Sequence, residues 1–290
     1  MRAHPGSIKL LAAGVLCAAG LNVTVVAVAA DLCLRGPAEA QVAFHGLPNF
    51  DGAGGSATPI LYPAPNLAGM LGGIIAHGLL VNGGRDREKA RIREEADKVL
   101  LPYQADLLLF RHDELLGAAL AQLNVAGAKR LAAPAAPPAA SETAVDSVPL
   151  FYMTQDRRAL VLVNTLSVRA AGAAAPLQKI VRVVSAPRAA DAEAGWTDGA
   201  HNLLRRTSIA MQARAIEIAL ADAAASPTAA AAAPFRTVRY EEGGVERMER
   251  AQVVDEQCGE LLLRTLRGEL MAVPRKAASG DPLCTPHAGG

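Results

Sequence analysis

The sequence has few aromatic residues and almost no net charge. Aromatic side chains make up 3% of its 290 residues, so broad stacking surfaces for bases or sugars are not expected. The 29 basic and 28 acidic residues leave a formal charge of +1, which gives no long-range field to attract DNA, RNA or an anionic membrane. We therefore expect no nucleic-acid partner. The apolar fraction is 51%, much of it alanine, so the core must depend on a smaller set of Leu, Val and Ile residues.

The sequence also lacks the short motifs that identify common enzymes. It contains no HExxH zinc sequence, no Walker sequence, no GxSxG elbow and no dinucleotide-binding fingerprint. Paired carboxylates such as Glu94-Glu95 and Glu241-Glu242 lie in solvated contexts and are poor acid–base candidates. We therefore assign no catalytic residue, no metal ligand and no cofactor. A catalytic site assembled from distant residues would leave no such signature, so an enzyme is not excluded.

Residues 1–30 have the order of features that is typical of a signal peptide. Two basic residues precede an uncharged stretch from Leu10 to Ala30, and Ala27-Val28-Ala29 offers the small residues that signal peptidase recognises. We expect a bacterial protein that is exported to the periplasm or secreted. Because the apolar core of a signal peptide usually has about 7–15 residues, two alternatives stay open: an uncleaved inner-membrane anchor, or earlier cleavage after Gly20.

The four cysteines are interpreted through the expected compartment. Cys17 lies in the leader, and disulfides persist in the oxidising environment outside the cytosol. Cys258 and Cys284 are the natural pair, and the loop of about 26 residues between them would give about 3 kcal/mol of stabilisation. Cys33 is then left as a free thiol, an intermolecular link or a competitor in that pairing.

Residues 31–130 are expected to form a mostly helical region. One apolar stripe predicts a helix over 85–101, and a second helix is expected over 104–123. His112 falls on the apolar face of the second helix, where burial would lower its pKa and would require a hydrogen-bond partner. The apolar segment 67–81 has two glycines four residues apart, so it is either a membrane-contacting or oligomerising segment or a buried part of the core.

An Ala/Pro-rich stretch at residues 131–147 predicts a linker or a long surface loop and marks the main candidate domain boundary. Residues 148–290 are expected to form an α+β sheet domain. A helix over 201–224, with Asp198 as its N-cap, is apolar around most of its circumference and should pack on a sheet. Its expected strands follow from β-rich runs and glycine-containing turns, and they lie at 148–154, 159–168, 177–185, 235–241, 245–254, 259–266 and 269–273. A further short strand is expected at 40–44.

The segment RTVRYEEGGVERMERAQVVDEQCGELLLRTLRGELMAVP, residues 236–274, resembles the C-terminus of an uncharacterised exported proteobacterial protein family. The run FYMTQDRRALVLVNTLSV, residues 151–168, is similar in style to the same family. The resemblance covers about half of the chain, mainly its C-terminal half. It implies export but carries no activity and no functional residue.

These observations predict an α+β fold in which a mostly helical N-terminal region precedes a mainly antiparallel sheet domain with one long packed helix. The expected function is that of a non-enzymatic cell-envelope protein that binds a protein or surface partner. Two alternatives remain from the sequence: a periplasmic hydrolase without a recognisable motif, and a membrane-associated assembly subunit that uses residues 67–81.

Overall fold

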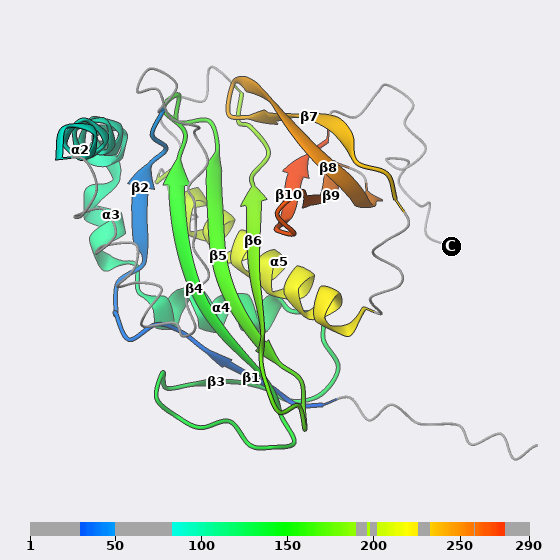
Figure 1. Cartoon of the computed structure of the whole chain (residues 1–290). Helices are drawn as coiled ribbons and strands as arrows, with labels where there is room; N and C mark the ends of the chain where they lie inside the picture. Colours follow the sequence, from blue (N-terminus) through cyan, green and yellow to red (C-terminus); the bar gives the residue numbers. More distant parts are fainter. Residues whose placement is uncertain are drawn as a thin grey trace, which may run out of the picture.

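The computed structural model describes residues 30–49, 83–189, 196–197, 202–225, 233–257 and 259–275. Within these residues one mixed, mostly antiparallel sheet of ten strands is combined with helices, which confirms the α+β class (Figure 1). The strands are β1 (Leu32–Arg35), β2 (Ala43–Gly46), β3 (Lys129–Ala132), β4 (Thr143–Met153), β5 (Leu160–Arg169), β6 (Leu177–Val184), β7 (Arg236–Glu242), β8 (Val245–Gln257), β9 (Glu260–Thr265) and β10 (Leu270–Pro274). The helices are α2 (Gly83–Asp97), the 3-10 helix η3 (Lys98–Tyr103), α3 (Gln104–Leu109), α4 (His112–Gln122) and α5 (Leu203–Ala224).

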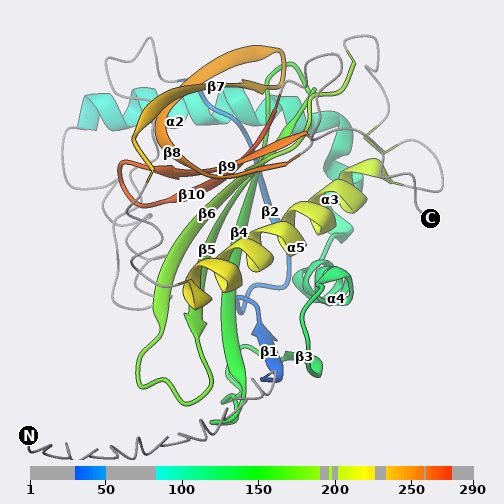
Figure 2. The same ribbon diagram turned by 90° about the vertical axis from the view of Figure 1, so that its right-hand side faces the viewer.

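The strands follow the order β3-β1-β4-β5-β6-β10-β9-β8-β7, and β2 also pairs with β4. Because β4 is long, β1 lies along its first half and β2 along its second half, both parallel to it. Strand β10 is parallel to β6, and β7 to β10 form the expected antiparallel meander. Helices α4 and α5 cover one face of the sheet, and the meander curls over the other face (Figure 2).

Strand β5 is covered on both faces, as its continuous apolar run predicts. Leu162 and Leu166 pack into the main core beneath the helices, whereas Val161 belongs to the smaller core between β5, β6 and the meander. This arrangement places β5 in the centre of the molecule and makes it the strand on which both layers rest.

The long helix α5 lies where the sequence predicts it, and Leu204, Met211 and Ile218 are buried along one side. Its N-cap is Asn202, whose side-chain oxygen accepts a hydrogen bond from the Arg205 N–H at 3.1 Å. The expected cap, Asp198, lies outside the described residues.

Three buried polar side chains form a closed ring between α5 and the sheet. The Ser147 hydroxyl donates to Asn164 Oδ1 at 3.0 Å, Asn164 Nδ2 donates to Gln212 Oε1 at 3.1 Å, and Gln212 Nε2 donates to Ser147 Oγ at 2.8 Å. All three residues are at most 1% exposed. Because each side chain is satisfied by the other two, the ring fixes α5 in one position over β4 and β5.

In the meander, the turn between β7 and β8 is tight, as the paired glycines predict. Gly243 adopts a φ of 66°, a conformation that side chains with a Cβ rarely take, and the Gly244 N–H donates to Asp156 Oδ2 at 2.5 Å. Opposite charges also pair across this hairpin, as expected: Arg239 with Glu246, and Arg247 with the buried Glu242.

The N-terminal region contains the expected helices, but it also contributes three strands to the sheet. Residues 131–132 and 143–147, which were expected to belong to the linker, form part of β3 and the first half of β4. Between them the loop is held by side chains from its neighbours: Arg35 Nη1 donates to Ala136 O at 3.0 Å, and Glu142 accepts the Ala139 N–H at 2.7 Å. The Ala/Pro composition of this loop correctly predicts an irregular backbone, but it gives no sign of these contacts. The proposed domain limits stay a prediction.

The helix expected over 104–123 is broken between α3 and α4, so that part of the prediction is wrong. Phe110 and Arg111 are extended because residues 40–42 pair with them, the Val42 N–H donating to Phe110 O at 3.1 Å. Leu108, just before the break, is 68% exposed, although it lies four residues before His112 and would share its apolar face in an unbroken helix. Tertiary pairing thus overrides a helical pattern that is continuous in the sequence.

Replacing Gln212 by Leu tests the polar ring. We expect a loss of about 2–3 kcal/mol in the free energy of unfolding, because Ser147 and Asn164 would each lose a partner in the core. The triple variant Ser147→Ala, Asn164→Leu, Gln212→Leu should recover at least half of that loss. The measurement is guanidinium denaturation followed by circular dichroism. Ser208→Ala is the control, since the Ser208 hydroxyl bonds only Leu204 O within its own helix; a Gln212→Leu loss no larger than the control's would contradict the ring's role.

Candidate binding cleft

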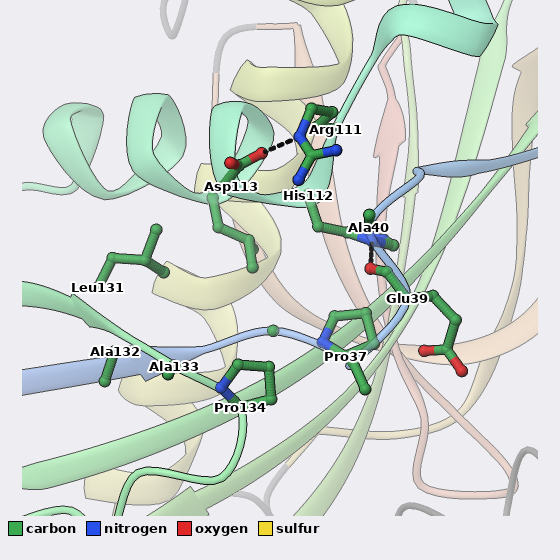
Figure 3. Close-up of a pocket in the computed structure, with 13 residues that line it drawn as sticks. Pro37, Glu39, Ala40, Arg111, His112, Asp113, Leu131, Ala132, Ala133 and Pro134 are labelled. Carbon is green, nitrogen blue, oxygen red and sulfur yellow. Dashed lines mark hydrogen bonds and ion pairs between the residues drawn. The ribbon is translucent and has the colours of Figure 1, made fainter.

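The break between α3 and α4 opens a cleft at the start of α4. Its volume is about 370 Å³, near the lower end of the roughly 300–1,000 Å³ typical of ligand pockets. Three segments form its walls: the loop after β1, the first turn of α4 and the end of β3 (Figure 3). The lining residues are Gly36, Pro37, Ala38, Glu39, Ala40, Arg111, His112, Asp113, Leu116, Leu131, Ala132, Ala133 and Pro134.

The loop after β1 is fixed against the start of α4 by main-chain and side-chain bonds. The His112 N–H donates to Ala40 O at 2.8 Å, and Gln41 Nε2 donates to Leu108 O at 2.8 Å. Gly36 permits the close approach of Leu116, because a Cβ at this position would lie 2.5 Å from Leu116 Cδ1. This wall of the cleft is therefore held in place before any ligand binds.

His112 acts as a buried link in the same wall. Its Nδ1 lies 2.8 Å from Glu39 O, and because a carbonyl oxygen only accepts, Nδ1 must carry the proton. Burial lowers the pKa of His112, as its place on the apolar face predicts, and the ring is therefore neutral at pH 7. Its Nε2 is buried and has no partner among the described residues. Through its bond to Glu39 O, His112 supports this wall of the cleft.

The opposite wall is stiffened by two ion pairs. Arg35 holds Asp146 through two bonds of 2.5 and 2.8 Å, and Arg130 holds Glu142 through two bonds of 2.6 Å. The Arg130 guanidinium and the Ala139 N–H lower the pKa of Glu142 to about 2. These pairs connect β1, β3 and β4 to the loop 133–142. The wall of the cleft that this loop helps to form is therefore fixed as well.

The charged side chains of the lining lie on the exposed rim of the cleft, and the rest of the lining is mostly apolar. Arg111 and Asp113 pair with each other at 3.2 Å on the exposed rim, and Glu39 is also exposed. The apolar part of the lining, which we call the floor, is made up of its alanine, proline and leucine residues. The lining includes no serine, threonine or cysteine. Among the described residues, no group of three or more His, Cys, Asp or Glu side chains is placed to hold a metal ion.

Several parts of the chain for which the sequence makes predictions lie outside the described residues. They are residues 1–29 of the leader, the apolar segment 67–81, and both members of the pair Cys258 and Cys284. Cys33 is described and is a buried free thiol in β1, where burial raises its pKa. The cleft itself was not predicted, since only the unexpected helix break brings its three walls together. No helix in the described ranges is both long enough and apolar enough to span a membrane.

No protein-family model matches the chain, and neither the curated proteins nor the solved structures contain a significantly similar one. The function is therefore inferred from the geometry and chemistry of the cleft.

The lowered pKa of His112 predicts a pH-dependent stability. As the pH falls below about 6.5, His112 is protonated in the unfolded chain but stays neutral in the folded chain, where its pKa is lower. The free energy of unfolding should therefore fall. His112→Gln keeps a side-chain donor for Glu39 O but cannot titrate, and its decline between about pH 7.5 and 5.5 should be smaller. Denaturation midpoints of both proteins at the two pH values measure the difference. Equal declines for wild type and His112→Gln would refute the assignment.

Proposed function

We propose that this is an exported cell-envelope protein that binds a partner protein without catalysis, and that the cleft at the start of α4 is its contact site. The observation that carries the proposal is the combination of an apolar floor with walls fixed by Arg35, Arg130 and His112. A fixed cleft loses little conformational entropy when it is occupied, so most of the contact energy remains for affinity. The two carboxylates of the lining, Glu39 and Asp113, lie on its exposed rim, and Asp113 is paired with Arg111, an arrangement that suits contact with a partner.

The proposed compartment is supported by the pattern of residues 1–30 and by the resemblance of residues 236–274 to an exported family. Fractionation of cells that express the full chain, combined with mass spectrometry of the recovered protein, tests it. We expect a processed chain in the periplasmic or secreted fraction. An unprocessed chain recovered in the cytosol would overturn the proposed location.

Filling the cleft tests the contact site. Ala133 lines the cleft and is exposed, so Ala133→Trp should occupy the space without disturbing the core. Crosslinking of cell envelopes followed by affinity capture of the full chain should retain a partner with the wild-type protein and lose it with this variant. Ala186→Trp, at an exposed position that is not part of the lining, is the matched control and should keep the partner. A partner captured equally well by both variants would place the contact site elsewhere.

A further inference from the structure

Strand β3 lies at the end of the sheet, and among the described strands it pairs with β1 alone (Figure 1). Its residues Leu131 and Ala132 line the cleft. The two strands are parallel, with Leu32 opposite Lys129, and the Leu32 N–H donates to Ala128 O at 2.8 Å. In a parallel pair alternate residues point their main-chain groups at the neighbouring strand. This register turns Arg130 and Ala132 toward β1 and turns Lys129 and Leu131 away from it.

The main-chain groups of Lys129 and Leu131 therefore form an open hydrogen-bonding edge. No described residue bonds to the N–H or C=O of either one. Both residues are exposed, Leu131 at 37%. Two donors and two acceptors in the spacing of a strand are complementary to one kind of occupant, which is another extended chain.

The open edge is held rigid by its side chains. Lys129 Nζ donates to Leu123 O at 2.9 Å, which connects β3 to the end of α4, and Arg130 is held by Glu142 on the other face. Leu131 lies on the side of α4, because a Cβ on Gly117 would be 3.9 Å from Leu131 Cδ2. The cleft lies on this side too, since Leu131 and Leu116 both line it.

The charges at this edge select among extended chains. Lys129 has no carboxylate partner among the described residues, whereas Arg130 is already paired with Glu142. A second copy pairing through β3 would bring two such cationic strands together, which is unfavourable. A segment with an acidic residue opposite Lys129 and an apolar residue opposite Leu131 matches both positions, because residues two apart lie on the same face of a strand.

We propose that an extended segment of a partner protein binds by adding as a strand to the open edge of β3, with an apolar side chain over the cleft and an acidic one beside Lys129. This inference rests on the proposed function and specifies its ligand. Main-chain bonds to Lys129 and Leu131 supply affinity, and the cleft and the lysine supply selectivity.

A display library of linear peptides of about ten residues, the upper length of an ordinary strand, is the probe. Panned against the full chain, it should yield peptides with an acidic residue two positions from an apolar one. Leu131→Pro removes an outward N–H without touching a bond to β1, so β3 should persist. An enriched, labelled peptide should bind this variant about tenfold more weakly than wild type. The reason is that a carbonyl of the peptide loses the N–H of residue 131 as its hydrogen-bond donor. Leu131→Ala keeps the N–H and is the matched control, with a smaller loss.

A second measurement leaves the protein unchanged. N-methylation of the peptide amide that faces Leu131 should weaken binding by a similar factor of about ten, because it removes the other main-chain bond. One outcome would overturn strand addition and leave the cleft as a binding site. In it, the peptide binds Leu131→Pro normally and its N-methylated form binds the wild-type protein normally, yet the peptide fails to bind Ala133→Trp. A crosslinked partner that depends on the cleft, without any enriched peptide, would do the same. Absence of both would overturn the proposed function as well.

Discussion

The short pairing between residues 40–42 and 108–112 determines the shape of the N-terminal half of the molecule. In an unbroken helix the Leu108 carbonyl would accept from the His112 N–H, and the Phe110 carbonyl from the Glu114 N–H. Here Gln41 donates to Leu108 O, Val42 donates to Phe110 O, and the Glu114 N–H is satisfied by Asp113 Oδ1. The His112 N–H donates to Ala40 O, so all four of these groups have other partners, and the chain turns at Phe110. The cleft exists because α4 begins at that turn.

The C-terminal half depends on a different constraint, the position of α5 over the sheet. An alanine-rich helix packs closely but offers few large side chains to define its position along a sheet. Polar contacts supply that definition: the buried ring holds the middle of α5, and Asp222 at its end bonds both Lys179 on β6 and Arg264 on β9 at 2.5 Å. The helix therefore connects the central strands with the meander. Breaking one partner costs more than these bonds contribute in net terms, because the groups left behind remain buried.

The sequence indicates the C-terminal half well and the N-terminal half poorly. Strands β5 and β6 and helix α5 have periodic apolar patterns, and the Gly243 turn has a composition that few other conformations tolerate. Strands β1 and β3 have four residues each, too few for a period to appear, and their place depends on partners about a hundred residues away. The burial and neutrality of His112 were predictable from its helical face, but the cleft beside it was not. Its walls come together through tertiary pairing that leaves no local signal.

The distribution of charge around the cleft limits how a ligand can be recognised. Arg35, Arg130 and the rim residue Arg111 are each paired with an acidic side chain of the chain itself, so these cations hold the walls and offer little field to a ligand. What remains for recognition is the apolar floor, the open main chain of β3 and Lys129. Such a site recognises the extended main chain of a ligand and the alternation of its side chains more than its net charge. A short edge that carries lysine also discourages indiscriminate pairing, which is how an exposed strand end can remain available without promoting aggregation.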